Sequence, residues 1–212
     1  MISPHLDDAV LSCAGLLAGA VVATVCTVGG PGGPVTDWDK ACGFGPGDDV
    51  MAVRKREDQA ALALLGARPE WLGVVEGQYA PLEVDAVVAA VREVVARVDP
   101  RTVAVPLGVD HVDHRLIADV CFDVVDRELL VYLELPYATR HPHEVDRRLA
   151  ELDLPLEAYG VPAVDPARKR AAVHCYRTQC RPLWGDLHQV MVPERCYRVS
   201  TLPGRTTRPG SS

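Results

Sequence analysis

The sequence predicts an α/β fold in which helices cover both faces of a mostly parallel sheet, and three observations carry this prediction. Its strand-like segments are apolar on both faces, as the strands of a buried parallel sheet are. Helix-like segments alternate with them along the chain. The chain has 212 residues, 48% of them hydrophobic, which is enough for one core and is most simply a single domain.

Four segments are the predicted strands of this sheet. The best is Val21–Val28, and Thr102–Pro106 and Leu129–Leu133 follow with the same apolar character, while Trp71–Val74 is a weaker candidate. Met1–Ser3 would complete the sheet as its first strand. Three residues is short for a buried central strand, so the sequence is also compatible with a truncated start.

Three segments between these strands have helical patterns. Val50–Leu65 carries Ala, Leu and paired charges, and Gly66 follows it as a stop signal. Leu82–Val98 is apolar at helical spacing, and Arg115–Asp126 is the third predicted helix. Strands and helices in this order indicate a Rossmann-like three-layer sandwich.

The stretch Leu11–Val28 is about as long as a membrane span, but it does not have the flanks of one. A signal peptide needs a basic start, and here the acidic pair Asp7-Asp8 occupies that place. We expect a buried helix and then a buried strand, broken near Gly19-Ala20. The protein is then expected to be cytoplasmic and to have no membrane partner.

Charge and cysteine content exclude several classes of protein. With 22 Lys and Arg against 29 Asp and Glu, the net charge is −7, so no basic face invites nucleic acid or anionic lipid. The seven cysteines are odd in number and not tightly spaced, which favours reduced thiols over a disulfide framework. Association into a homo-oligomer is compatible with this composition.

Two segments are rich in Gly and Pro. Gly29–Asp49 is long for a loop that follows a strand, and it is either a functional lid or a disordered insertion. Residues 203–212 have the composition of a disordered tail, so the predicted domain spans residues 1–202.

The N-terminal residues 3–9 place a histidine and two adjacent carboxylates where the first strand should turn into a helix. A catalytic zinc ion takes three protein ligands and leaves one position for water, and His5 can supply a nitrogen. Asp7 and Asp8 are consecutive and cannot point the same way, so one can bind metal while the other faces the open position. The alternative is plain helix capping, for which Asp is favoured.

A second cluster follows the predicted strand Thr102–Pro106. His111 and His114 are three residues apart, so at the start of a helix they lie on one face. One can complete a metal triad while the other reaches bound substrate, and Asp110 and Asp113 can orient the rings or be further ligands. Both clusters fall at carboxyl ends of strands, where parallel sheets gather their ligands.

These motifs resemble those of one known family. Pro4-His5-Leu6-Asp7-Asp8 is similar to a Pro/Ala-His-Pro-Asp-Asp motif, and His111-Val112-Asp113-His114 to a His-x-x-His motif, of the PIG-L/LmbE-like N-acetylglucosaminyl deacetylases. Residues 54–66 and 169–179 also resemble family segments. Leu6 and Thr178 depart from the common Pro and Ser of the family.

The resemblance implies roles for five residues. His5, Asp8 and His114 would be the ligands of one divalent metal ion, with Zn²⁺ favoured and Fe²⁺ the alternative. Asp7 would be the general base. His111 would steady the oxyanion or protonate the leaving amine.

Weaker signals come from residues outside these two motifs. Arg54 and Asp113 are candidates for substrate binding, and a helix-surface salt bridge with Glu57 or Asp58 is the alternative for Arg54. Trp38 and Asp39 could cover a sugar ring or anchor their loop. Tyr176 and Gln179 are expected to support packing of the C-terminal part of the chain. His141 and His143 flank Pro142 in a predicted loop that either borders the site or, as the sequence favours, carries them as plain surface histidines.

The resemblance predicts a metal-dependent amide hydrolase that removes an acetyl or small acyl group from the nitrogen of an amino sugar or related conjugate, a small-molecule substrate. An amidase acting on a thiol or natural-product conjugate is the nearest alternative. A metallophosphoesterase is another, although such sites often hold two metals and need more ligands. An inactive binding module is a third, but it would not need the spare carboxylate of Asp7.

Overall fold

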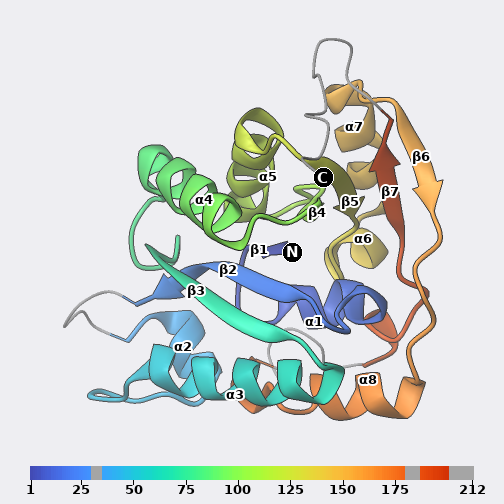
Figure 1. Cartoon of the computed structure of the whole chain (residues 1–212). Coiled ribbons are helices and arrows are strands. Elements are labelled where there is room, and N and C mark those ends of the chain that lie inside the picture. The colour runs from blue at the N-terminus through green and yellow to red at the C-terminus, as the bar shows by residue number, and fades with distance from the viewer. Residues whose placement is uncertain (30–34, 180–186, 201–212) are drawn as a thin grey trace.

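A computed structural model describes residues 1–29, 35–179 and 187–200 (Figure 1). The predicted tail, 203–212, and residues 30–34 of the long Gly- and Pro-rich segment lie outside the described residues. Two hydrogen-bonded sheets form the centre. In spatial order the first contains β1 (Ile2–Ser3), β2 (Val21–Val28) and β3 (Arg68–Val75), and the second β4 (Thr102–Pro106), β5 (Glu128–Tyr132), β7 (Cys196–Val199) and β6 (Leu156–Tyr159).

The strands are mostly parallel, as predicted. β1, β2 and β3 pair in parallel, as do β4 and β5, while β7 is antiparallel to both of its neighbours. The two sheets adjoin where β1 lies against β4, and the Tyr132 hydroxyl donates to the carbonyl oxygen of Ile2 at 3.0 Å. The short first strand is therefore a central one.

The helices lie on both faces of this central layer (Figure 1). Their bounds are α1 Asp8–Cys13, α2 Asp37–Ala41, α3 Val50–Leu65, α4 Val84–Val98, α5 Val112–Val124, α6 Tyr137–Arg140, α7 Pro142–Leu152 and α8 Pro166–Val173, with 3₁₀ turns at Ala14–Leu16 and Leu187–Gln189.

Alternation along β2 divides the core between the two faces. Ala23 and Val25 pack with α4 and α5, whereas Val22 packs with α1, α3 and α8 on the other face. The chain is thus a three-layer α/β domain, and the predicted fold class is confirmed.

Several predicted boundaries coincide with the structure. β2, β4 and α3 begin and end at the predicted residues, and α3 stops at Gly66, which has a left-handed φ of 75°. The apolar stretch after Asp8 is a buried helix, a 3₁₀ turn and then β2, with the break at Gly19, as expected. Among the described residues, no helix is both long and apolar enough to cross a bilayer.

Other boundaries differ from the prediction. α5 begins at Val112, three residues early, so His111 is its N-cap. His141 and His143, expected in a loop, flank the first residue of α7, because Pro142 takes the first helical position, where its missing N–H costs nothing. The described part of the Gly- and Pro-rich segment contains α2 rather than structureless chain.

The strand β3 is irregular. Pro69 lies within it, its pairing with β2 shifts register twice, and Gly73 has a φ of 79°. The Gly73 N–H donates to the Thr27 hydroxyl at 2.9 Å. A glycine in this conformation together with a shifted register is typical of a bulged strand.

A buried carboxylate joins α3, β3 and the segment that follows α8. Asp58 of α3 is 1% exposed and accepts hydrogen bonds from Trp71 Nε1 at 3.0 Å and from the Tyr176 hydroxyl at 2.9 Å. Burial raises the pKa of Asp58 to about 7, against the opposing effect of the two hydrogen bonds. Its protonation state therefore differs between the folded and the unfolded chain.

Asp58→Asn is expected to change how stability depends on pH. The folded wild type keeps Asp58 protonated up to a pH of about 7, whereas the unfolded chain ionises near pH 4. Its stabilising contribution is full below pH 4 and is lost as pH rises through 7, a loss on the order of 4 kcal/mol. Asn mimics the protonated form at every pH. As pH rises over this range, the free energy of unfolding of the variant should therefore increase relative to that of the wild type.

Urea unfolding of both proteins at pH 4 and pH 8 measures this difference. Asp85→Asn, at an exposed aspartate, is the control and should follow the wild type. Equal free energies of unfolding for Asp58→Asn and wild type at both pH values would show that Asp58 ionises in the folded state as freely as in the unfolded one.

Candidate metal and active site

The turn between β1 and α1 presents His5, Asp7 and Asp8. The Ser3 hydroxyl accepts the Ala9 N–H at 3.2 Å and donates to the His5 carbonyl at 2.8 Å, and Asp8 Oδ2 accepts the His5 N–H at 2.8 Å. Asp7 stands at the N-cap position but makes no capping bond. The capping interpretation is therefore wrong for Asp7, because Ser3 and Asp8 bind the backbone of this turn.

Asp7 is instead a buried carboxylate with an unused hydrogen-bond acceptor. It is 3% exposed, and its Oδ2 has no hydrogen-bond partner among the described residues. Burial and the adjacent charge of Asp8 raise the pKa of Asp7 to about 7. Burial acts on Asp8 in the same direction, but the charges and hydrogen bonds of His114 and His5 outweigh it and hold the Asp8 pKa well below its usual range.

The loop after β4 carries the second cluster. Gly108 and Asp110 have left-handed φ values of 87° and 63°, which turn the chain from the strand into α5. His111 ends this loop, and its Nδ1 accepts the Asp113 N–H at 3.2 Å. His114 lies in the first turn of α5 and is fully buried.

Three donor atoms from these clusters converge. His5 Nδ1 lies 3.1 Å from His114 Nε2 and 3.4 Å from Asp8 Oδ2, and His114 Nε2 lies 3.2 Å from Asp8 Oδ2. The ligands of a tetrahedral ion with bonds of 2.0–2.1 Å are about 3.3 Å apart. Two imidazoles and a carboxylate at this spacing therefore fit a divalent ion such as zinc.

His111 extends this cluster toward the pocket. Its ring, with those of His5 and His114, forms a set in which one nitrogen of each lies within 4.8 Å of the others. Burial lowers the pKa of His111 to about 4, helped by the two neighbouring rings. His111 is therefore neutral near pH 7.

A carboxylate holds the far side of the His5 ring. Asp113 Oδ2 lies 3.1 Å from His5 Nε2 and accepts the Gly77 N–H at 3.1 Å. This contact leaves His5 Nδ1 for the metal position, which is the orienting arrangement common among histidine ligands. Asp113 is 3% exposed and does not line the pocket described below.

Glu134 faces the other nitrogen of His114 in an ion pair, a contact that the sequence does not predict. It is fully buried just after β5, and its Oε1 lies 3.4 Å from His114 Nδ1. Its oxygens also accept three backbone N–H groups of the loop after β4, from Leu107 at 3.1 Å, Gly108 at 2.7 Å and Val109 at 3.2 Å. The one signal for Glu134 in the sequence is a carboxylate between the apolar residues that directly follow β5.

Glu134→Gln is expected to weaken metal binding by about 10–100-fold, because an amide orients the His114 ring less strongly than a carboxylate. Metal titration against a competing chelator measures the affinity. Glu128→Gln is the matched control, since Glu128 starts β5, which Glu134 follows, and it pairs with Arg198 and does not line the pocket. An affinity equal to that of the control, in a variant with an unchanged melting temperature, would contradict this role.

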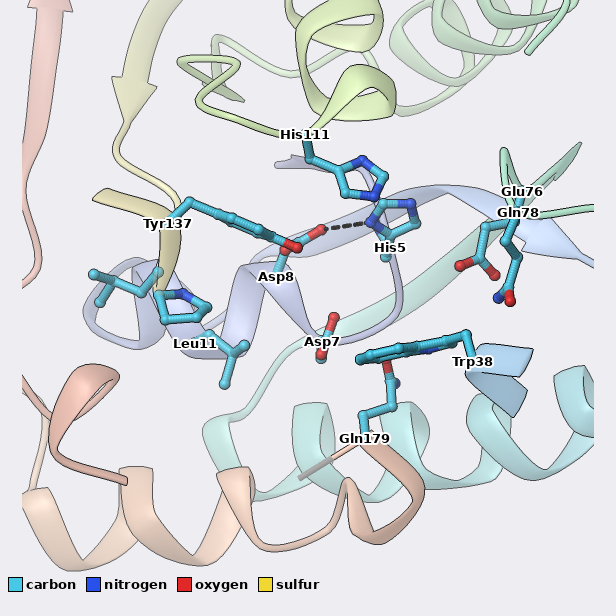
Figure 2. A pocket seen from close by; sticks show the side chains of 12 residues that line it. His5, Asp7, Asp8, Leu11, Trp38, Glu76, Gln78, His111, Tyr137 and Gln179 are labelled. Carbon is cyan, nitrogen blue, oxygen red and sulfur yellow. Dashed lines mark hydrogen bonds and ion pairs between the residues drawn. The ribbon is translucent and has the colours of Figure 1, made fainter. Parts of the chain in front are cut away.

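A pocket of about 310 Å³ opens in front of the cluster (Figure 2). Its floor contains four residues predicted from the sequence, His5, Asp7, Asp8 and His111. The remaining lining residues come from α1, α2, the segments after β3 and β5, and the C-terminal part, namely Leu11, Trp38, Glu76, Gln78, Leu135, Pro136, Tyr137 and Gln179. Gln179, expected only to support packing, thus borders the site.

The sequence offered two roles for Arg54, substrate binding or a salt bridge on the helix surface, and the structure places its side chain differently from both. Its guanidinium is buried and lies 3.0 Å from Asp39 Oδ1 and 3.4 Å from Glu76 Oε2, rather than beside Glu57 or Asp58 on the helix surface. Arg54 does not line the pocket. Its two partners are 15 and 22 residues away in the chain, which no local spacing rule detects.

The fold and this cluster define a class of protein, an α/β domain with a histidine- and carboxylate-rich site at the carboxyl edge of its sheet. Residues 1–125 match the family model of PIG-L, described as GlcNAc-PI de-N-acetylase. The chain therefore belongs to the PIG-L family of deacetylases, and the family resemblance of its motifs is confirmed. A search of curated proteins finds no match.

Solved structures of similar fold include deacetylases. The A40926 pseudoaglycone deacetylase Dbv21 is 28% identical, with a TM-score of 0.72 over 93% of this chain and 94% of that one. The zinc-inhibited form of the teicoplanin deacetylase Orf2 is 22% identical, with a TM-score of 0.75 over 94% and 96%. N,N'-diacetylchitobiose deacetylase from Pyrococcus horikoshii is 16% identical, with a TM-score of 0.54 over 90% and 73%.

Proposed function

We propose that this protein is a metal-dependent deacetylase that removes an acetyl or small acyl group from the nitrogen of an amino sugar, free or within a glycoconjugate. The observation that carries the proposal is the convergence of donor atoms from His5, Asp8 and His114 beside the unpartnered carboxylate of Asp7. Membership of the PIG-L family and the likeness to a pseudoaglycone deacetylase support the substrate class.

His5, Asp8 and His114 would hold the ion. When bound, a divalent ion polarises an amide carbonyl and lowers the pKa of a coordinated water toward neutrality. Zn²⁺ suits two imidazoles and a carboxylate, and Fe²⁺ is the alternative.

Asp7 would act as the general base. It borders the pocket next to Asp8, and its unpartnered Oδ2 can accept a proton from the attacking water. The same oxygen can return that proton to the departing nitrogen, which must leave as a neutral amine.

His111 would steady the oxyanion. Its Nδ1 accepts a backbone hydrogen bond from Asp113, so the neutral ring carries its proton on Nε2. A neutral N–H donor suits hydrogen bonding to the developing negative charge better than full proton transfer. Of the two roles expected for His111, this geometry favours the first.

A substrate panel tests the proposed function. The metal-loaded protein is incubated separately with four kinds of compound: N-acetylglucosamine, an N-acylated glycopeptide, N-acylated thiol conjugates and p-nitrophenyl phosphate. Free amine is measured for the first three and free phosphate for the last. Release of amine from the sugar or glycopeptide supports the proposal. Amine from the thiol conjugates alone would favour the amidase alternative, and phosphate alone a phosphoesterase. Binding without turnover of any compound would indicate an inactive module.

A further inference from the structure

One wall of the pocket is built by α2 and by the segment that follows β3. Trp38 lies in the first turn of α2 and presents its indole to the pocket, on the side away from Tyr137 (Figure 2). Gln78 lines the same wall. Neither residue belongs to the metal cluster. This wall can therefore determine which amine part of a substrate binds beside the acyl group.

A hydrogen-bond chain fixes the direction of the Gln78 amide. The Thr36 hydroxyl accepts the Asp39 N–H at 3.0 Å in the capping box that begins α2. It donates its own proton to Gln78 Oε1 at 2.7 Å. The Gln78 Nε2 group is buried and has no hydrogen-bond partner in the part of the chain that the structure describes. Two N–H donors beside the indole are therefore left for a ligand.

A buried ionic contact holds this wall in place. Asp39 is fully buried, and it accepts a hydrogen bond from Arg54 Nη2 at 3.0 Å and another from the Tyr79 hydroxyl at 2.9 Å. Asp39 also receives the Thr36 N–H in the capping box, at 3.3 Å. Asp39 and Tyr79, which directly follow Trp38 and Gln78, are thus joined to each other, and Asp39 is joined to Arg54 of α3. These contacts fix the relative position of the two segments.

We propose that Trp38 and Gln78 form a subsite for a polyhydroxylated ring. The apolar face of such a ring packs on the indole, and one of its hydroxyl oxygens accepts a hydrogen bond from Gln78 Nε2. An acyl amine without hydroxyls would leave the buried Gln78 donors unpaired, which disfavours it. The inference rests on the proposed function, because it assigns this ring to the amine part of the substrate.

The test uses the full-length, metal-loaded protein and two amines that it cannot hydrolyse. Glucosamine carries the hydroxylated ring, and cyclohexylamine has a six-membered ring without hydroxyls. Their dissociation constants are measured by calorimetry for wild type, Trp38→Ala, Trp38→Phe, Gln78→Ala and the control Gln59→Ala, at an exposed position of α3. Saturation-transfer NMR identifies which ring protons of glucosamine contact the protein.

We expect wild type and Gln59→Ala to bind glucosamine about tenfold more tightly than cyclohexylamine. Gln78→Ala should remove this difference. Trp38→Ala should weaken the binding of both amines by about tenfold, and Trp38→Phe should restore much of it. Equal binding of both amines to wild type, or unchanged glucosamine binding in Trp38→Ala, would overturn the inference.

The outcome is separable from the fate of the proposed function. If no N-acyl compound of the panel is hydrolysed but glucosamine binding still depends on Trp38 and Gln78, the ring subsite stands and the deacetylase proposal fails. If N-acetylglucosamine is hydrolysed while both variants bind glucosamine as wild type does, the deacetylase proposal stands and this subsite is wrong. Trp38→Phe, which keeps an aromatic ring at this position, tests the stacking even if Trp38→Ala fails to fold. The preference of wild type for glucosamine over cyclohexylamine tests the hydroxyl contact without any variant.

Discussion

Asp7→Asn is expected to keep its metal and to lose about 10²–10⁴-fold in kcat. The change removes the proton-accepting oxygen but keeps the size of the side chain and leaves the three converging donor atoms untouched, so metal content should stay at the wild-type level. Asn also relieves the repulsion between two adjacent buried carboxylates, and the melting temperature should not fall. Metal analysis and steady-state kinetics on the best substrate of the panel measure the two effects.

The matched control for Asp7→Asn is Asp49→Asn, which changes an aspartate at the start of α3 outside the pocket. It should leave kcat unchanged. Full turnover in Asp7→Asn would remove Asp7 from the role of base. Loss of metal together with turnover would instead place Asp7 among the ligands.

His114→Ala is expected to abolish stable metal binding and, with it, activity. The substitution removes one of the three converging donors and leaves His5 and Asp8 alone, and it also leaves the buried carboxylate of Glu134 without its ring. Loss of a ligand and an unpaired buried charge act in the same direction. Metal content after gel filtration and the affinity for Zn²⁺ measure the effect.

His143→Ala is the control for this change, because the His143 side chain is 74% exposed and is not among the residues that line the pocket. It should bind metal as wild type does. Unchanged metal content in His114→Ala would exclude His114 as a ligand and favour a set built from His5 and His111.

The placement of both clusters could be predicted because strand ends are visible in the sequence. The short strand β1 ends at Ser3, just before His5, and the apolar strand β4 ends at Pro106, one short loop before His111, so both motifs lie at the carboxyl edge of a parallel sheet. To predict that His111 and His114 lie on one face, it was then enough to expect a helix to start near them. Local patterns of this kind are sufficient when the residues concerned follow a strand directly or after a short loop.

The partners that orient these side chains could not be predicted in the same way. Glu134 reaches a loop that lies 25 to 27 residues earlier, and Gln78 receives its hydrogen bond from Thr36, which is 42 residues away. Such contacts depend on which strands become neighbours and on side-chain directions at their ends. A single carboxylate or amide in the sequence does not reveal them.

The irregular strand β3 has a consequence for the behaviour of the protein at high concentration. β3 is an edge of the first sheet, and among the described residues it pairs only with β2. Pro69 has no N–H to offer an incoming strand, Arg68 and Glu70 add charge, and the bend at Gly73 makes the edge a poor template. The edge that could recruit a neighbouring chain into a growing sheet is thereby blunted, which protects the folded protein against aggregation.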